Sequence, residues 1–403
     1  MTRSKGENQP PLPGVIAEVD RLLRLARTRD ASDLHLEPTA EGLTVRMRLD
    51  GVLQDVETLP KDLARPIVSR IKLLADLLTY RTDVPQEGRL REEDVDGLGD
   101  LRVSTFPTIH GERVVVRFFG TSRPNFDLES LNFPLAVLDG LRRAVSATSG
   151  VVLLTGPAGS GKTTTLYALL SGILARSSHR IHIITVEDPV ESVLPGVTQT
   201  QVNVPGGLTY AAALRSLLRQ DPEVVMVGEI RDRETAEIVT QAGLTGHLVL
   251  STLHGGDVAS VIARLLEMGL EPYVVTSALK ALLAMRLVRH LCGDCRRQGP
   301  RVPLRISGHV HETNTFESVG CAGCGSTGFR GRLPVVEFTT VSGELKKLIL
   351  RSSDSDALQA QLHAEHVRTL LERGIELVET GRTTLDELQR VLGPIETEES
   401  THG

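Results

Sequence analysis

The sequence is poor in aromatic residues and has no long apolar run. Aromatic side chains make up 3% of its 403 residues and tryptophan is absent, so the aromatic platforms on which single-stranded nucleic acids stack are scarce. No window approaches the roughly 18 uncharged apolar residues of a membrane-spanning helix, and the polar, proline-rich start MTRSKGENQPPLPG is unlike a secretory signal. We therefore expect a cytoplasmic protein with no transmembrane segment, which reaches a membrane only through a protein partner.

Basic residues are also not in excess over acidic ones. The 45 Lys and Arg residues stand against 51 Asp and Glu residues and give a formal net charge of −6, the wrong sign for a general polyanion binder. This charge predicts that nucleic acid is not a partner. The apolar share of 40% and the charged share of 24% are those of an ordinary globular protein, and the length predicts two or three domains.

Cysteine is scarce, but its placement is informative. The four cysteines form two CxxC pairs, Cys292 with Cys295 and Cys321 with Cys324, separated by residues 296–320. They are too few for a disulfide scaffold in a chain of this length. Four thiolates suit tetrahedral zinc and leave no open coordination position, so we predict a structural Zn²⁺ site at these residues. Redox use of one CxxC pair and unpaired buried thiols are the alternatives.

The order of apolar patterns predicts two folded parts and an appended end. Strand-like alternation and helical runs near residues 14–27 and 66–78 predict an α+β unit first. Strands alternating with helices follow, among them helices near 257–268 and 273–290, which predicts a parallel sheet with helices on both faces. The predicted organisation is a flexible tail at 1–12, an α+β domain at 13–120, a linker at 121–133, an α/β domain at 134–290, a tetracysteine module at 291–335, a helical region at 336–394 and a tail at 395–403.

The segment VVLLTGPAGSGKTTTLYALL predicts a nucleoside triphosphate site. An apolar strand precedes its Gly-x4-Gly-Lys-Thr pattern and a strongly helix-forming run follows, which is the context that a phosphate loop requires. Glycines let backbone N–H groups converge on phosphate oxygens, Lys162 reaches the β and γ phosphates, and Thr163 is a ligand for Mg²⁺. The residues predicted to bind ATP are Gly156, Pro157, Ala158, Gly159, Ser160, Gly161, Lys162, Thr163 and Thr164.

Acidic residues and a histidine follow the next predicted strands. ITVEDPVE carries Glu187, Asp188 and Glu191, VVMVGEI carries Glu229, and HLVLSTLH ends with His254. Any one of these alone is usually a solvated loop residue, but the carboxyl ends of parallel strands meet over one crevice. Glu229 replaces the aspartate that usually holds magnesium and is placed to orient water near the γ-phosphate, which His254 is placed to contact.

Taken together, these segments resemble a known family. GPAGSGKTTTLYALL, TVEDPVE, LRSLLRQDPEVVMVGEIRDRETAEIV and GHLVLSTLH closely resemble the GspE/PilB-type secretion ATPases, the hexameric motors of type II secretion and type IV pilus assembly. ASDLHLEP, PQEGRL and GFRGRLPVVEF extend the resemblance to roughly residues 15–390. The family implies a RecA-like P-loop ATPase core preceded by a PAS-like domain. It also implies a homo-hexamer recruited to the inner face of the cytoplasmic membrane by inner-membrane platform proteins.

The resemblance assigns roles to the acidic residues and the histidine. It makes Glu229 the catalytic glutamate of the Walker B strand. It places Glu187 and Asp188 in the Asp box and His254 in the His box. Pilus retraction ATPases generally lack the tetracysteine zinc module, so its presence favours an assembly or secretion motor.

The resemblance also gives meaning to arginines whose ordinary interpretation is a solvated charge. It implies that Arg89 and Arg102 swing from the N-terminal domain onto the nucleotide phosphates when the domains close. Loss of the γ-phosphate would then release that domain, so that hydrolysis becomes rotation. Arg215, Arg219 and Arg231 are candidates for contacts across the subunit interface.

Two departures from the family keep other functions open. Gly255 and Gly256 stand where the family usually has Thr-Asn, which predicts a looser γ-phosphate-sensing loop. We also expect no additional N-terminal docking domain of the kind that secretion ATPases usually have. A low-turnover, ATP-gated scaffold is therefore one alternative, and a RecA-like nucleic-acid translocase is another. The sequence does not distinguish type II secretion, pilus assembly and a competence pseudopilus.

Overall fold

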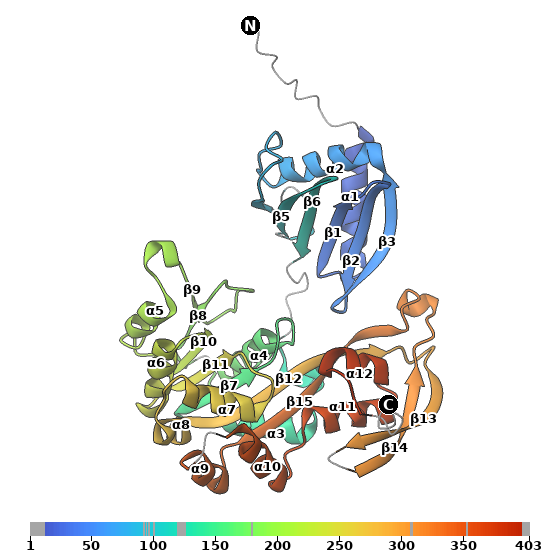
Figure 1. The fold of residues 1–403 in the computed structure, drawn as a ribbon. Coiled ribbons are helices and arrows are strands. Elements are labelled where there is room, and N and C mark those ends of the chain that lie inside the picture. The colour runs from blue at the N-terminus through green and yellow to red at the C-terminus, as the bar shows by residue number, and fades with distance from the viewer. Residues whose placement is uncertain are drawn as a thin grey trace. The chain divides into compact units, whose positions relative to one another are not determined.

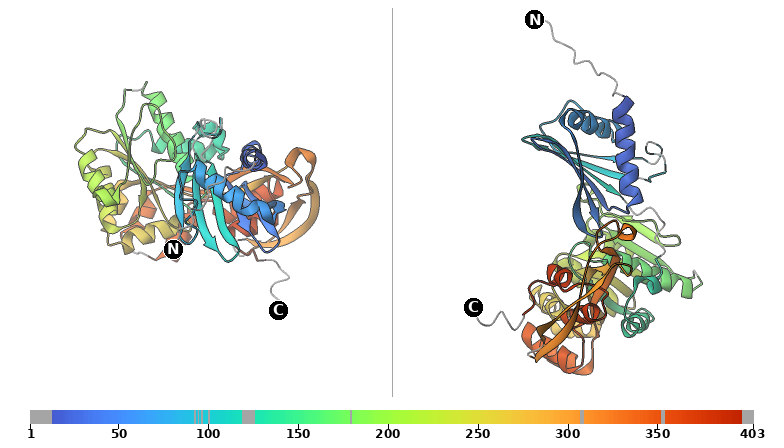
Figure 2. Two further views of the ribbon diagram at one scale, coloured as in Figure 1. Left: turned by 90° about the horizontal axis from the view of Figure 1, so that it is seen from above. Right: turned by 90° about the vertical axis from the view of Figure 1, so that its right-hand side faces the viewer.

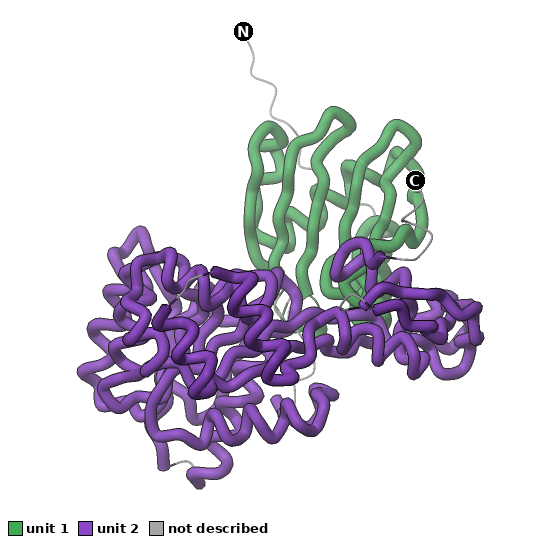
Figure 3. Tube along the Cα trace, turned by 60° about the horizontal axis from the view of Figure 1, so that its bottom comes forward, with its two compact units in different colours: residues 1–124 green, residues 125–403 purple. Residues whose placement is uncertain are grey.

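The computed structural model consists of two compact units, Met1–Pro124 and Asn125–Gly403 (Figure 3). The residues that it describes are 13–91, 93, 95, 97–99, 101–118, 126–178, 180–306, 309–351 and 354–396. The predicted N-terminal tail at 1–12 and part of the predicted linker, 121–125, lie outside them. Of the predicted C-terminal tail only Ile395 and Glu396 are described; Ile395 is buried, and the Glu396 carbonyl accepts a hydrogen bond from the N–H of Arg305.

The first unit is an antiparallel sheet with two helices, the α+β organisation that the sequence predicts. Its six strands follow the order β3-β2-β1-β6-β5-β4. The elements are α1 (Pro13–Thr28), β1 (Asp33–Pro38), β2 (Gly42–Leu49), β3 (Val52–Pro60), α2 (Lys61–Leu74), β4 (Gln86–Leu90), β5 (Leu101–Thr108) and β6 (Gly111–Phe118).

One face of this sheet is covered by α1 and α2 (Figure 2). Leu34 and Leu36 of β1 are fully buried in the core with both helices. They lie on the same face because alternate residues of a strand point the same way. The fully buried Lys72 of α2 donates from Nζ to Glu112 of β6 at 2.6 Å and to the Arg81 carbonyl at 2.7 Å. This paired charge fixes α2 to the sheet.

The second unit contains a seven-stranded sheet in the order β15-β12-β7-β11-β10-β8-β9, parallel except for β15. Its strands are β7 (Gly150–Thr155), β8 (Ile183–Glu187), β9 (Thr198–Gln201), β10 (Val224–Ile230), β11 (Leu248–Leu253), β12 (Leu279–Leu291) and β15 (Phe329–Thr340). Its helices are α3 (Leu135–Ala144), α4 (Lys162–Arg176), α5 (Tyr210–Leu217), α6 (Arg233–Leu244), α7 (Val258–Glu267), α8 (Pro272–Ala278), α9 (Gly343–Ile349), α10 (Ser355–Ala364), α11 (Leu370–Glu379) and α12 (Leu385–Leu392).

Helices bury both faces of this sheet, as predicted. In β7, Val152 and Leu154 pack in one core with α3 and α4. Val151 and Leu153 pack in another core with α5 to α8 and the C-terminal helices. A strand buried on both faces reads as a continuous apolar run, which is why VVLLT shows no alternation.

The predicted helix at 273–290 is confirmed only as far as Ala278 and is wrong for the residues that follow. The structure ends α8 at Ala278 and continues directly into β12, which pairs with β7 on one side and β15 on the other (Figure 1). The run LKALLAMRLVRHL is rich in Leu, Ala and Met, which are good helix formers. Its burial between two strands overrides that propensity, because tertiary context decides between helix and strand for such a run.

The tetracysteine segment and the C-terminal helices are continuous with this sheet. The first cysteine pair follows β12, the second precedes β15, and β13 (Arg297–Ile306) and β14 (His309–Glu317) form a hairpin between them. Helices α11 and α12, red in Figure 1, pack beside β12. Glu387 of α12 is buried and accepts hydrogen bonds from Arg289 of β12 and from Arg390. Among the described residues, no helix has both the length and the apolar character to cross a membrane.

Candidate active site

The phosphate loop connects the buried strand β7 to the N-terminus of α4. Gly156, Gly159 and Gly161 have φ angles of +151°, +74° and +93°, which L-residues rarely adopt. A Cβ at Gly156 would lie 2.4 Å from the Met285 carbonyl oxygen, so only glycine fits against β12 there. No side chain caps α4, and a helix N-terminus with uncapped N–H groups is suited to bind an anion.

Lys162 lies at the first position of α4 with its ammonium folded onto the loop. Its Nζ donates to the Gly156 carbonyl at 2.7 Å and to the Pro157 carbonyl at 2.9 Å. Burial lowers its pKa, the carboxylate of Glu229 opposes that effect, and the charge of Arg286 adds to it. The acceptors of these bonds are neutral carbonyl oxygens, so an anionic phosphate can replace them and add the attraction of opposite charges.

Glu229 and Asp188 share one arginine at the carboxyl end of the sheet. Arg231 donates from Nε to Glu229 at 2.7 Å and from Nη1 to Asp188 at 3.1 Å. The Glu229 hydrogen bond raises the pKa of Arg231, against its partial burial. The guanidinium also lies 5.8 Å from the centre of the Tyr210 ring. Sequence reasoning placed Arg231 among candidates for a subunit interface and missed this contact, because a residue two positions from Glu229 carries no sequence signal of pairing with it.

Glu187 differs from Glu229 in being buried and fully bonded. It is 2% exposed, and its carboxylate accepts hydrogen bonds from the hydroxyls of Tyr167 and Thr185 and from the Gln199 amide. The pKa of Tyr167 is raised mainly by burial and, to a smaller extent, by its hydrogen bond to Glu187. These bonds fix the end of β8, and the next residue, Asp188, pairs with Arg231.

One cavity of about 430 Å³ brings part of the predicted ATP-binding loop together with Glu187, Glu229 and His254. Of the residues predicted to bind ATP, those that line it are Ala158, Gly159, Lys162 and Thr163. Its walls include Lys162 and Thr163 of the loop and α4, Glu229 of β10 and the exposed His254 after β11, all at the carboxyl ends of parallel strands. The full lining is Ala158, Gly159, Lys162, Thr163, Leu166, Glu187, Asp188, Pro189, Glu191, Tyr210, Met226, Gly228, Glu229, Arg231, Thr252 and His254.

The other predicted arginines lie elsewhere. Arg89 of β4 and Arg102 of β5 are exposed cross-strand neighbours in the first unit, and Arg102 pairs with Glu87 at 2.7 Å. In the second unit, Arg215 forms an ion pair with Glu234 and Arg219 is exposed. Their predicted roles at the phosphates and at a subunit interface stay predictions.

The four cysteines converge as predicted. Their sulfurs lie within 4.8 Å of one another, and Cys292–Cys321 and Cys295–Cys324 are both 3.9 Å apart. Ligands 2.3 Å from a tetrahedral Zn²⁺ lie about 3.8 Å apart, so the cluster has the right size. The N–H groups of Cys321 and Gly328 donate to Cys324 Sγ at 3.2 Å, which favours a thiolate there.

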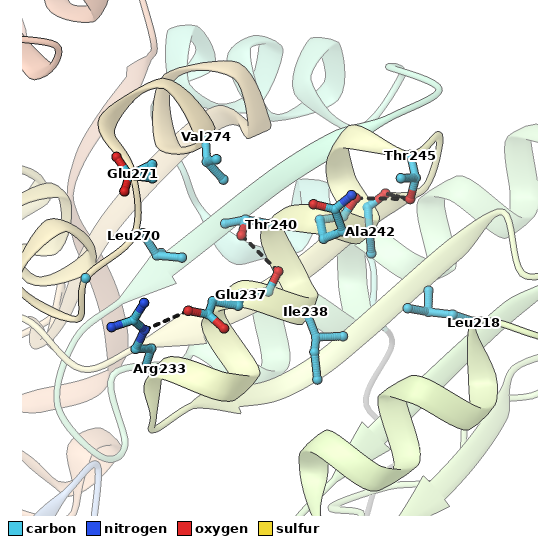
Figure 4. A pocket seen from close by; sticks show the side chains of 12 residues that line it. Leu218, Arg233, Glu237, Ile238, Thr240, Ala242, Thr245, Leu270, Glu271 and Val274 are labelled. Carbon is cyan, nitrogen blue, oxygen red and sulfur yellow. Dashed lines mark hydrogen bonds and ion pairs between the residues drawn. The ribbon is translucent and has the colours of Figure 1, made fainter.

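A second hollow, of about 480 Å³, lies beside α6 and the α7–α8 connection (Figure 4). Its apolar walls are formed by Leu218, Ile238 and Leu270. The cationic side chain among its lining residues is Arg233, which pairs with Glu237 at 2.6 Å. It therefore offers no free positive charge to a phosphate.

The chain is similar to proteins of secretion and pilus systems. It is 43% identical over 377 residues to the type II secretion system protein HxcR of Pseudomonas aeruginosa, covering 94% of this chain and 77% of that protein. It is 37% identical over 398 residues to the type IV pilus assembly ATPase PilB of Thermus thermophilus, covering 96% of this chain and 44% of that protein.

The fold is also that of a solved ATPase. The X-ray structure of the Legionella pneumophila ATPase DotB superposes with a TM-score of 0.68 at 20% identity, over 96% of this chain and 97% of DotB. The family model described as type II/IV secretion system protein matches residues 10–390. The chain thus belongs to the type II/IV secretion system protein family.

Proposed function

We propose that this protein is an Mg²⁺-dependent ATPase that works as a homo-hexameric motor, powering pseudopilus assembly for type II secretion or assembly of a type IV pilus. The observation that carries this proposal is the shared cavity, where an uncapped helix N-terminus, Lys162, Glu229 and His254 meet. Membership of the family and the names of its relatives support the secretion setting. Inner-membrane platform proteins would recruit the motor to the cytoplasmic face.

Each group has a role suited to its position. The loop N–H groups and Lys162 bind the phosphates, and the Thr163 hydroxyl is the Mg²⁺ ligand. Glu229, whose side chain is 30% exposed, orients the attacking water and accepts its proton. Arg231 holds Glu229 in place, and His254 contacts the terminal phosphate.

The cysteine cluster fits a structural Zn²⁺ site. Cys292, Cys295, Cys321 and Cys324 would hold the ion with four thiolates, a shell without an open position for substrate. Bound there, zinc ties the end of β12 to the start of β15. It supplies stability to the ATPase sheet rather than chemistry.

Steady-state phosphate release tests the proposal against its two alternatives. We expect the full-length protein to hydrolyse ATP, a purified platform protein in lipid vesicles to stimulate it, and single-stranded DNA or RNA to have no effect. Stimulation by nucleic acid instead would favour the translocase. ATP binding with no turnover in either setting would favour the scaffold. Lys162→Ala is the control that detects contaminating ATPases, because it removes the phosphate-binding cation.

A further inference from the structure

The loop that follows β11 is held by its backbone carbonyls. The carbonyl of His254 accepts a hydrogen bond from Arg264 Nη1 at 3.0 Å and that of Gly255 accepts one from Thr155 Oγ1 at 3.0 Å. The carbonyl of Gly256 accepts one from Arg286 Nη2 at 2.7 Å. Three successive peptide groups are thus anchored to α7, β7 and β12. The loop is fixed to the three elements that surround it.

The two glycines of this loop do not loosen it. A Cβ at Gly255 would lie 2.8 Å from Val261 Cγ2 and 3.1 Å from Thr155 Oγ1, so glycine allows the loop to pack closely against β7 and α7. A Cβ at Gly256 would lie 3.7 Å from Ser260 Oγ, an ordinary contact. Close packing at Gly255 and the three carbonyl bonds oppose the flexibility predicted from the Gly-Gly sequence.

Arg286 is the anchor that comes from β12. It follows Met285, whose carbonyl oxygen approaches Gly156 and also accepts a hydrogen bond from Arg286 Nη1 at 3.0 Å. Its guanidinium therefore lies between the phosphate loop and the His254 loop. Burial lowers the pKa of Arg286, and the carboxylates of Asp257 and Glu337 oppose that effect. The positive charge of Arg286 in turn contributes to the lowered pKa of Lys162.

We propose that Arg286 is a positioning residue that sets the His254 loop against the phosphate loop through its hydrogen bond to the Gly256 carbonyl. This inference rests on the proposed ATPase function. The guanidinium donates to Gly256 and to the Met285 carbonyl of its own strand at the same time, so it holds the His254 loop to the part of β12 that packs against Gly156. The carbonyls that Arg286 contacts belong to β12 and the His254 loop, whereas those that Lys162 contacts belong to the phosphate loop itself.

Arg286→Met tests the proposal in the full-length protein, because methionine keeps the apolar stem and removes the donors. We expect kcat for ATP to fall about tenfold and KM to change less than threefold, since the phosphate-binding N–H groups remain. Arg286→Lys restores one donor and should recover part of kcat. Lys280→Met removes an exposed cation from the same strand and serves as the matched control.

Hydrogen–deuterium exchange separates positioning from a direct phosphate contact. In Arg286→Met we expect faster exchange in peptides covering residues 252–260 and unchanged exchange in α4, in the absence of nucleotide. Unchanged exchange in 252–260 would overturn the proposal, and so would a large rise in KM with kcat preserved. If the wild type hydrolyses no ATP, the proposed function fails, while the exchange experiment still decides whether Arg286 holds the loop.

Discussion

The charged residues at the carboxyl ends of β8 and β10 differ from those beside β12 in burial and in pairing. At the carboxyl ends of β8 and β10, Glu229 and Asp188 are partly exposed and share Arg231, itself 54% exposed. Beside β12, Glu387 has a fully buried side chain and is bonded to both Arg289 and Arg390. Catalysis needs groups whose partners can be exchanged for substrate and water, whereas stability comes from buried groups that are completely satisfied. Mutations should therefore separate turnover from stability.

Glu229→Gln should give the largest effect, on turnover alone. Removing the carboxylate that accepts a proton from water should lower kcat about 1000-fold. Nucleotide affinity and the thermal midpoint should stay near wild type, because the side chain is partly exposed. Phosphate release, nucleotide binding and thermal unfolding measure the three quantities.

The control for that experiment lies next to the opposite end of the same strand. Glu223 precedes β10 at its opposite end and accepts a hydrogen bond from the His182 N–H at 2.6 Å. Glu223→Gln neutralises a carboxylate without touching the cavity and should keep full turnover. Normal phosphate release by Glu229→Gln would refute the role given to Glu229.

Cys321→Ser should give the next largest effect, on stability alone. Loss of one thiolate should release zinc and lower the free energy of unfolding by about 3 kcal/mol, since a structural zinc site contributes directly to folding. Elemental analysis and thermal unfolding with and without a chelator measure this. The control Ala322→Ser adds a hydroxyl at the exposed neighbouring position. Wild-type protein that contains no zinc after expression in zinc-supplemented medium would contradict the assignment.

Glu387→Gln should lower the free energy of unfolding by about 2 kcal/mol while leaving KM for ATP unchanged. Burial opposes ionisation of Glu387, but the hydrogen bonds from Arg390 and Arg289 outweigh it and lower its pKa. The exposed Glu379 on α11 offers the control Glu379→Gln, which should change stability by less than about 0.5 kcal/mol.

The pH dependence of this effect has a defined sign. A carboxyl group whose pKa is lower in the folded state stabilises above its unfolded pKa, about 4.3. That contribution is lost as the pH falls through the folded pKa. The difference in unfolding free energy between wild type and Glu387→Gln should be constant above about pH 5 and shrink below about pH 4. A difference that instead grows on acidification would contradict the pairing.

The sequence predicted the parts of the site that depend on local pattern. The phosphate loop, the strand ends at Glu229 and His254 and the convergence of the cysteines follow from short motifs and from the rule that parallel strands end at one edge. The structure places the loop, Glu229 and His254 around one cavity, and the cysteines in one cluster. These predictions needed no knowledge of side-chain partners.

What the sequence missed depends on tertiary partners. The strand β12 was predicted as a helix because its Leu, Ala and Met content favours one, and only pairing with β7 and β15 makes it a strand. The sharing of Arg231 by Glu229 and Asp188, and the burial of the Glu187 carboxylate under Tyr167, have no local signature. Gly-Gly after His254 predicted a loose loop, whereas contacts from three other elements hold it.

Arg89→Ala should give the smallest effect, and it extends the comparison to the first unit. Arg89 and Arg102 lie on the face of that sheet that α1 and α2 leave uncovered, since Leu90, Leu101 and Val103 point into the core. If Arg89 reaches the phosphates only when the domains close, its loss should cut turnover about tenfold with nucleotide affinity within about twofold of wild type. The control is Arg65→Ala, at an exposed position of α2. Unchanged turnover in Arg89→Ala would contradict the role that the resemblance gives to Arg89.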